Sequence, residues 1–135
     1  MDILSATFVE SVDFRQAEGG ATRIDLTGVL FSLAAPSPPP VTIAPHLVVL
    51  VRCREGESGF AALEVVFKDG TGEQVARSVM PFQVEPGKFG YRLVRGELTY
   101  EDYGTIEAHC QLDDGPMTVV PLTLLPPIGQ PGQAG

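Results

Sequence analysis

The sequence has no tryptophan, only two cysteines, only two histidines and no long hydrophobic run. A membrane-spanning helix needs at least about 18 apolar residues in succession, and no segment here approaches that length. Residues 1–11 also lack the basic start and unbroken apolar core of a signal peptide. These absences predict a soluble cytoplasmic protein that has no membrane partner.

Positive charge is also scarce. Nine Lys and Arg residues stand against seventeen Asp and Glu residues, which gives a net charge of −8. Such a field repels phosphate groups, whereas nucleic acid binding depends on cationic side chains that displace counterions. We therefore expect no nucleic acid partner.

The length of 135 residues suits one domain with its own core. The 15 glycines and 12 prolines favour turns over long helices. We expect one domain over residues 1–126 and a flexible Pro/Gly-rich tail over residues 127–135, because the ending PPIGQPGQAG has no periodicity.

Apolar and polar residues alternate with a period of two, which is typical of half-buried β-strands. The runs LSATFVESVDF and TRIDLTGVLFSL show this pattern, and the Gly19-Gly20 turn between them predicts a hairpin. Residues 46–51 are apolar on both faces, which predicts a strand in the middle of a sheet or under covering loops. About eight strands and no helical window predict an all-β antiparallel β-sandwich, immunoglobulin-like or C2/jelly-roll-like, whose strand order stays open.

Prolines mark the places where this pattern breaks. Four prolines between residues 36 and 40 predict an extended crossover, and the less favoured reading is a proline-rich ligand. Pro81 and Pro121 interrupt predicted strands, which indicates sheet edges or bulges.

Several short motifs follow one another along the chain. They are Gly19-Gly20, Leu26-Thr27-Gly28-Val29, Leu47-Val48-Val49, Asp69-Gly70 and Gly104-Thr105-Ile106-Glu107. In this order they resemble a bacterial family of small stand-alone domains of unknown function, over nearly the whole chain. The resemblance implies an immunoglobulin-like or C2-like sandwich and implies no activity.

Cys53 and Cys110 have a separation that suits the disulfide between the sheets of an immunoglobulin domain. However, Cys110 lies two residues later than that pattern requires, and the core tryptophan is absent. We therefore expect two thiols that behave as small core residues, and whether they lie close in space stays open.

No metal or catalytic site is predicted. His46, His109 and the two cysteines lack the spacing of metal ligands, and residues 109 and 110 point to opposite faces of a strand. Asp69, Asp113 and Asp114 are explained as turn residues instead of calcium ligands. The sequence has no nucleophile elbow and no phosphate-binding loop, so we expect no cofactor and no enzymatic activity.

A loop of aromatic and acidic residues is the first candidate interaction surface. It consists of Tyr100, Glu101, Asp102 and Tyr103, a composition that is favoured at protein interfaces. The alternative, a tyrosine corner that closes the sandwich, carries more weight.

A pair of arginines is the second candidate interaction surface. Arg52 and Arg54 share one face of a strand and are placed to grip an anionic partner. Pairing with acidic residues such as Glu64 or Glu107 is the commoner use of such arginines in sheets.

Together these features predict a non-enzymatic protein-interaction module or a subunit of a larger bacterial assembly. The partner is then another protein or a second copy. Two alternatives stay open. One is a small-ligand or carbohydrate-binding module that uses Phe89, Tyr91 and Tyr103 as stacking platforms. The other is a self-assembling structural subunit that uses residues 126–135 as a connecting arm.

Overall fold

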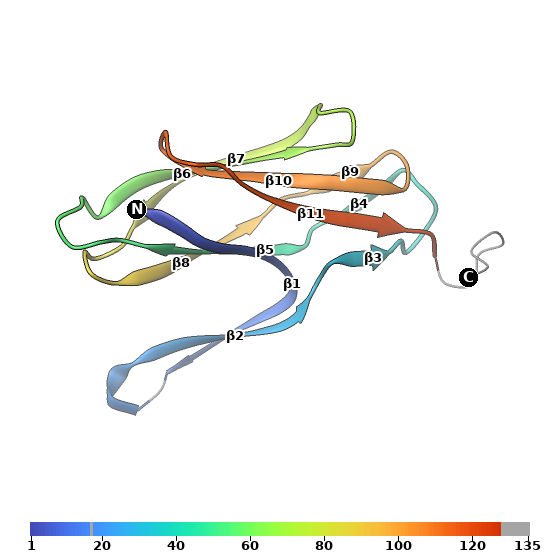
Figure 1. Ribbon diagram of the computed structural model, residues 1–135. Helices are drawn as coiled ribbons and strands as arrows, with labels where there is room; N and C mark the ends of the chain where they lie inside the picture. Colours follow the sequence, from blue (N-terminus) through green and yellow to red (C-terminus); the bar gives the residue numbers. More distant parts are fainter. Residues whose placement is uncertain (17, 128–135) are drawn as a thin grey trace.

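A computed structural model describes residues 1–16 and 18–127 and divides them into eleven β-strands and one 3₁₀ turn, η1 (Glu18–Gly20) (Figure 1). The long strands are β1 (Asp2–Gln16), β2 (Thr22–Val29), β5 (His46–Arg52), β6 (Phe60–Lys68), β7 (Gln74–Gln83), β8 (Phe89–Arg95), β10 (Gly104–Leu112) and β11 (Thr118–Leu125). The short strands are β3 (Ser32–Ala34), β4 (Val41–Ile43) and β9 (Leu98–Tyr100). The predicted all-β class is confirmed. The three short strands were not among the eight expected ones, because a segment of three residues is too short to show the alternation of apolar and polar residues.

Two sheets face each other and form a sandwich. The first sheet has the order β2-β1-β5-β8 and the second has the order β3-β11-β10-β6-β7. In Figure 1 strands β6, β7, β10 and β11 of the second sheet lie above β5 and β8 of the first. Strands β4 and β9 make a separate two-stranded ribbon, and β3 runs parallel to β11, whereas the other pairs are antiparallel. The predicted β-sandwich is therefore confirmed.

The core lies between these two sheets and follows the period-two pattern. Leu47, Val49 and Val51 of β5 are fully buried, and they face residues such as Leu63 and Phe67 of β6 within one apolar cluster. Each such side chain contributes about 2 kcal/mol through its removal from water. Because β5 pairs with both β1 and β8, the central strand predicted over residues 46–51 is confirmed.

The prolines lie where the hydrogen-bond ladder has no need of their missing N–H. Pro81 lies in β7, which is the edge strand of the second sheet, as predicted. Pro121 lies in β11, which is flanked by β10 and β3 and is therefore not an edge strand along its whole length. Strand β3 pairs with residues 123–125 alone, so Pro121 has no hydrogen-bonded strand on that side among the described residues. Residues 36–40 form bends between β3 and β4.

Strand β1 belongs to the sandwich over only half of its length. Residues 2–9 pair with β5, and residues 9–16 pair with β2. Since β5 begins at His46, opposite Val9, the chain beyond Val9 leaves the body of the first sheet. The resulting hairpin of residues 10–29, which we call the arm, projects beneath the sandwich in Figure 1. The hairpin itself was predicted, but its departure from the sandwich was not.

Among the described residues, no helix is long and apolar enough to cross a membrane. The predicted tail, residues 127–135, lies outside the described residues except for Pro127.

Candidate functional site

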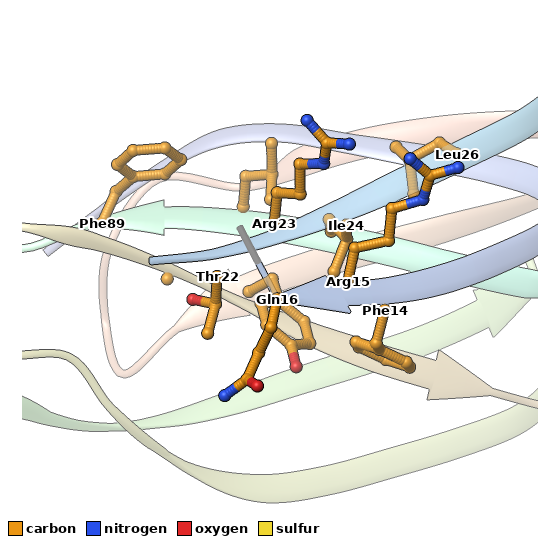
Figure 2. A pocket seen from close by; sticks show the side chains of 11 residues that line it. Phe14, Arg15, Gln16, Thr22, Arg23, Ile24, Leu26 and Phe89 are labelled. Carbon is orange, nitrogen blue, oxygen red and sulfur yellow. The ribbon is translucent and has the colours of Figure 1, made fainter. Parts of the chain in front are cut away.

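A groove of about 770 Å³ lies between the arm and the outer face of the first sheet. The arm contributes residues from both of its strands, and the sheet contributes residues of β5 and β8. The lining residues are Phe14, Arg15, Gln16, Thr22, Arg23, Ile24, Leu26, Leu50, Phe89, Gly90 and Tyr91 (Figure 2). Six of them carry large apolar side chains, so the groove is suited to apolar groups of a partner.

The arm turns its apolar face toward the sheet because of its register. Phe14 pairs with Ile24, and Leu26 pairs with Val12, so these side chains share one face of the ribbon. The ring of Phe14 lies 5.6 Å from the ring of Tyr91 on β8, measured between centroids, with the planes tilted by 40°. This is the range of favourable aromatic pairs, and the contact ties the arm to the sheet.

Several large side chains of the groove stay open to solvent. Phe14 is 57% exposed, Phe89 is 66% exposed and Tyr91 is 43% exposed. Phe89 and Tyr91 stand two residues apart on β8 and therefore point to the same face. Apolar groups gathered in this way on a surface mark sites of association more often than single exposed residues do.

The other face of the arm is charged. Asp13 lies opposite Asp25, and Arg15 lies opposite Arg23. The Nε atom of Arg15 lies 2.7 Å from the Oδ2 atom of Asp25, so the ion pair runs diagonally across the ribbon. In Figure 2 the side chains of Arg15 and Arg23 point to one side of the arm, and those of Phe14 and Gln16 point to the other.

The predicted loop of residues 100–103 connects β9 to β10. Tyr100 is buried, and its hydroxyl donates a hydrogen bond of 2.8 Å to the carbonyl oxygen of Leu122. Burial raises the pKa of this phenol. Tyr100 thus closes the sandwich in the manner of a tyrosine corner, whereas Glu101 and Asp102 are exposed and Tyr103 is half-buried.

This loop borders a second groove of about 500 Å³ together with the β6–β7 turn. In that turn the Asp69 carboxylate accepts hydrogen bonds from the Thr71 hydroxyl (2.6 Å) and from the backbone N–H groups of Thr71 (2.9 Å) and Glu73 (3.1 Å). These bonds, that from the Thr71 hydroxyl above all, lower the pKa of Asp69. The carboxylate therefore serves the turn, as the sequence indicated.

Arg52 and Arg54 both contact Asp2. Their Nη2 atoms lie 3.3 Å and 3.1 Å from its Oδ2 atom. Glu64 and Glu107, the partners suggested by the sequence, pair instead with Arg77 and with His109. The suggested partners were wrong, because β1 brings Asp2 alongside the end of β5. The segment after β5 and the loop before β10 lie at opposite ends of the sandwich, so the two predicted surfaces do not form one site (Figure 1).

Both cysteines are buried thiols that form no disulfide with each other. Cys110 lies in β10 between Val65 and Thr118, and burial raises the pKa of its thiol to about 11. The Nε2 atom of His109 lies 3.3 Å from a carboxylate oxygen of Glu107. Within residues 1–16 and 18–127, no group of three or more His, Cys, Asp and Glu side chains is arranged to hold a metal ion.

No protein-family model matches the chain, and no curated protein is significantly similar to it.

Sequence reasoning found part of the groove and missed the rest. Phe89 and Tyr91 were named as stacking platforms, but Phe14 and Leu50 were read as strand residues without a role. One signal was available: the alternation that begins near Leu4 continues to Phe14, longer than the run at residues 46–51 that pairs with it. A strand that outruns its partner must leave the sheet or find another neighbour.

Proposed function

We propose that the chain is a non-enzymatic protein-interaction module that holds a segment of a partner protein between the arm and the first sheet. The observation that carries this proposal is the set of exposed apolar side chains around the groove, chiefly Phe14, Phe89 and Tyr91. Aromatic residues supply large contact area at a low cost in conformational entropy, and they dominate the energetics of protein interfaces.

The groove also suits a partner with mixed character. Arg15 and Arg23 stand at its rim, and Gln16 and Thr22 offer hydrogen-bonding groups beside the apolar floor. An apolar centre with a polar, charged rim is the usual organisation of an interface. We therefore expect a bound segment with aromatic or aliphatic anchors flanked by acidic residues.

A selection from a library of random linear peptides displayed on phage tests this proposal. The selected peptides should bind the wild-type protein and Phe60→Ala alike, because Phe60 is an exposed aromatic residue on β6 in the other sheet. They should bind Phe89→Ala and Tyr91→Ala at least about tenfold more weakly, as expected for interface anchors. Failure to select any peptide, or equal binding to all four proteins, would contradict the proposal.

A small-ligand or carbohydrate-binding module is the second candidate. The specific observation in its favour is the co-facial exposure of Phe89 and Tyr91, with Phe14 packed against Tyr91. Sugar rings stack on such surfaces through their apolar faces. Saturable binding to a glycan array that disappears in Tyr91→Ala but not in Phe60→Ala would favour this alternative over the first.

The proposal also covers the cellular compartment, the class of partner and the family of the module. Unpaired buried thiols at Cys53 and Cys110 fit a reducing compartment such as the cytoplasm. The net charge of −8 supports a partner other than nucleic acid. Membership of the bacterial family that the chain resembles, and an immunoglobulin-like or C2-like version of the sandwich, belong to the same proposal.

A further inference from the structure

The outer edge of β2 exposes backbone groups that can pair with another strand. β2 is the last strand of the first sheet, so one side of it has no strand partner among the described residues. The N–H of Leu30 donates to the carbonyl oxygen of Phe8 at 2.7 Å. The direction of the N–H and C=O groups alternates from one residue to the next along an antiparallel pair. Since Leu30 bonds to β1, the backbone groups of the even-numbered residues of β2 also point toward β1. The N–H and C=O groups of Arg23, Asp25 and Thr27 therefore point toward the open edge.

This edge lacks the devices that protect others in the protein. In the second sheet, β7 carries Pro81 and β3 is only three residues long, both of which limit pairing with foreign strands. β2 contains eight residues and no proline. Its edge-facing residues carry charges of opposite sign, Arg23 and Asp25, instead of the single sign that would repel a second copy.

The charges on the arm are incompletely paired within one molecule. Asp25 contacts Arg15 at 2.7 Å, while Arg23 forms no ion pair within the described parts of the chain. Arg23 instead lies directly opposite Arg15, an arrangement of like charges that costs stability. Asp25 remains 41% exposed at its side chain and has room for a second cationic partner. The unpaired guanidinium group of Arg23 thus lies two residues from the accessible carboxylate of Asp25, on the same face of β2.

We propose that the β2 edge binds the β2 edge of a second copy, antiparallel and about a two-fold axis through Ile24. In this register Arg23 lies opposite the second copy's Asp25, and Asp25 lies opposite the second copy's Arg23. These two residues carry the edge-facing backbone groups, so they form the hydrogen-bonded pair of the ladder. Ile24 meets its counterpart in the non-hydrogen-bonded position, where side chains approach most closely.

The complementarity of this segment with itself favours a second copy over an unrelated strand. The triplet Arg23-Ile24-Asp25 reads basic, apolar, acidic, and its antiparallel copy presents acidic, apolar, basic. A two-stranded ribbon is marginally stable alone in water, whereas four strands share their ladder and their apolar face. Pairing would therefore order the arms of both copies. It uses the backbone edge of β2 and not Phe14, Phe89 and Tyr91, which carry the proposed function. The inference therefore stands independently of that function, although Arg23 and Ile24 also line the groove.

Charge reversal at the two positions tests the register. In sedimentation equilibrium over about 10 µM to 1 mM, a range suited to a small interface, the wild-type protein should approach the mass of a dimer. Arg23→Glu and Asp25→Arg should each raise the dissociation constant at least about tenfold, because each places like charges opposite one another twice. The double variant Arg23→Glu/Asp25→Arg should dimerise again, since the two charges are exchanged as a pair.

Mixing the two single variants gives the sharpest result. An equimolar mixture should form a one-to-one heterodimer, because each reversal then faces its complement, although neither variant dimerises alone. Thr71→Arg, at the β6–β7 turn, is the control for a change in net charge and should dimerise like the wild type. The inference is overturned if the wild-type protein stays monomeric, if both single variants dimerise normally, or if the mixture and the double variant remain monomeric. Loss of peptide binding in the groove variants would leave all of these results unchanged.

Discussion

Removing the Tyr100 hydroxyl is a direct test of the role that the structure gives this residue. Tyr100 is 3% exposed, and its hydroxyl donates to the carbonyl oxygen of Leu122 across 22 positions of sequence. Tyr100→Phe keeps the ring and its packing and removes only the donor. The net loss of one buried hydrogen bond, with its acceptor left in place, is about 1–2 kcal/mol.

That magnitude is measurable in a protein of this size. For 135 residues, a loss of 1 kcal/mol lowers the melting temperature by about 4 °C, so Tyr100→Phe should melt about 4–8 °C below the wild type. Urea unfolding, followed by circular dichroism in the far ultraviolet, should show a lower midpoint at an unchanged m-value. Tyr91→Phe is the matched control, because Tyr91 is 43% exposed and its change should stay within about 0.5 kcal/mol.

The result also decides how the loop of residues 100–103 is used. If Tyr100→Phe unfolds at the wild-type midpoint, the hydroxyl does not hold β9 against β11 and the reasoning from burial fails. If the midpoint falls as expected, a binding role for the loop depends on Glu101, Asp102 and Tyr103.

Three further predictions concern the core and one turn. Cys53 and Cys110 are fully buried, so neither should react with an aromatic disulfide reagent until urea unfolds the protein; rapid reaction of either thiol in the native state would refute their burial. The pKa of Cys110 is about 11 in the folded state, against 9.0 for an ordinary thiol. The protonated thiol therefore contributes to the free energy of unfolding fully below about pH 9, and this contribution is lost as the pH rises toward 11. This amounts to about 3 kcal/mol of unfolding free energy, and Cys110→Ala should lack that part of the pH dependence. Gly59→Ala should destabilise by about 2 kcal/mol in urea unfolding, because a Cβ atom there would lie 2.5 Å from the carbonyl oxygen of Val84, whereas Gly70→Ala, with nothing within 4 Å, should not.

The arm gives the proposed module two surfaces, which share Arg23 and Ile24. Its inner face, with Phe14 and Ile24, helps to form the groove, and its outer edge, with Arg23 and Asp25, is suited to a second copy. A pair of copies joined through this edge would present two grooves at once. Two linked sites bind a multivalent partner far more tightly than either site does, provided that the geometry allows both to engage.

The sequence by itself determined the class of the fold and many of its local features. Period-two alternation specifies strands wherever it occurs, because successive side chains point to opposite faces of an extended backbone. Turn chemistry at Asp69 and the hairpin at Gly19-Gly20 depend on residues close in sequence, so both were predictable. The edge position of Pro81 followed from the missing N–H of proline.

Tertiary structure alone decided which of these strands are covered. Phe8 and Phe14 stand on the same alternating run, yet Phe8 is 1% exposed and Phe14 is 57% exposed. The difference arises because β5 begins at His46 and leaves the second half of β1 without that neighbour. An alternating pattern reports that one face is apolar, but it carries no information on what lies against that face. The groove joins residues of β1, β2, β5 and β8 that are far apart in sequence, so its assembly depends on strand order, which local patterns do not encode.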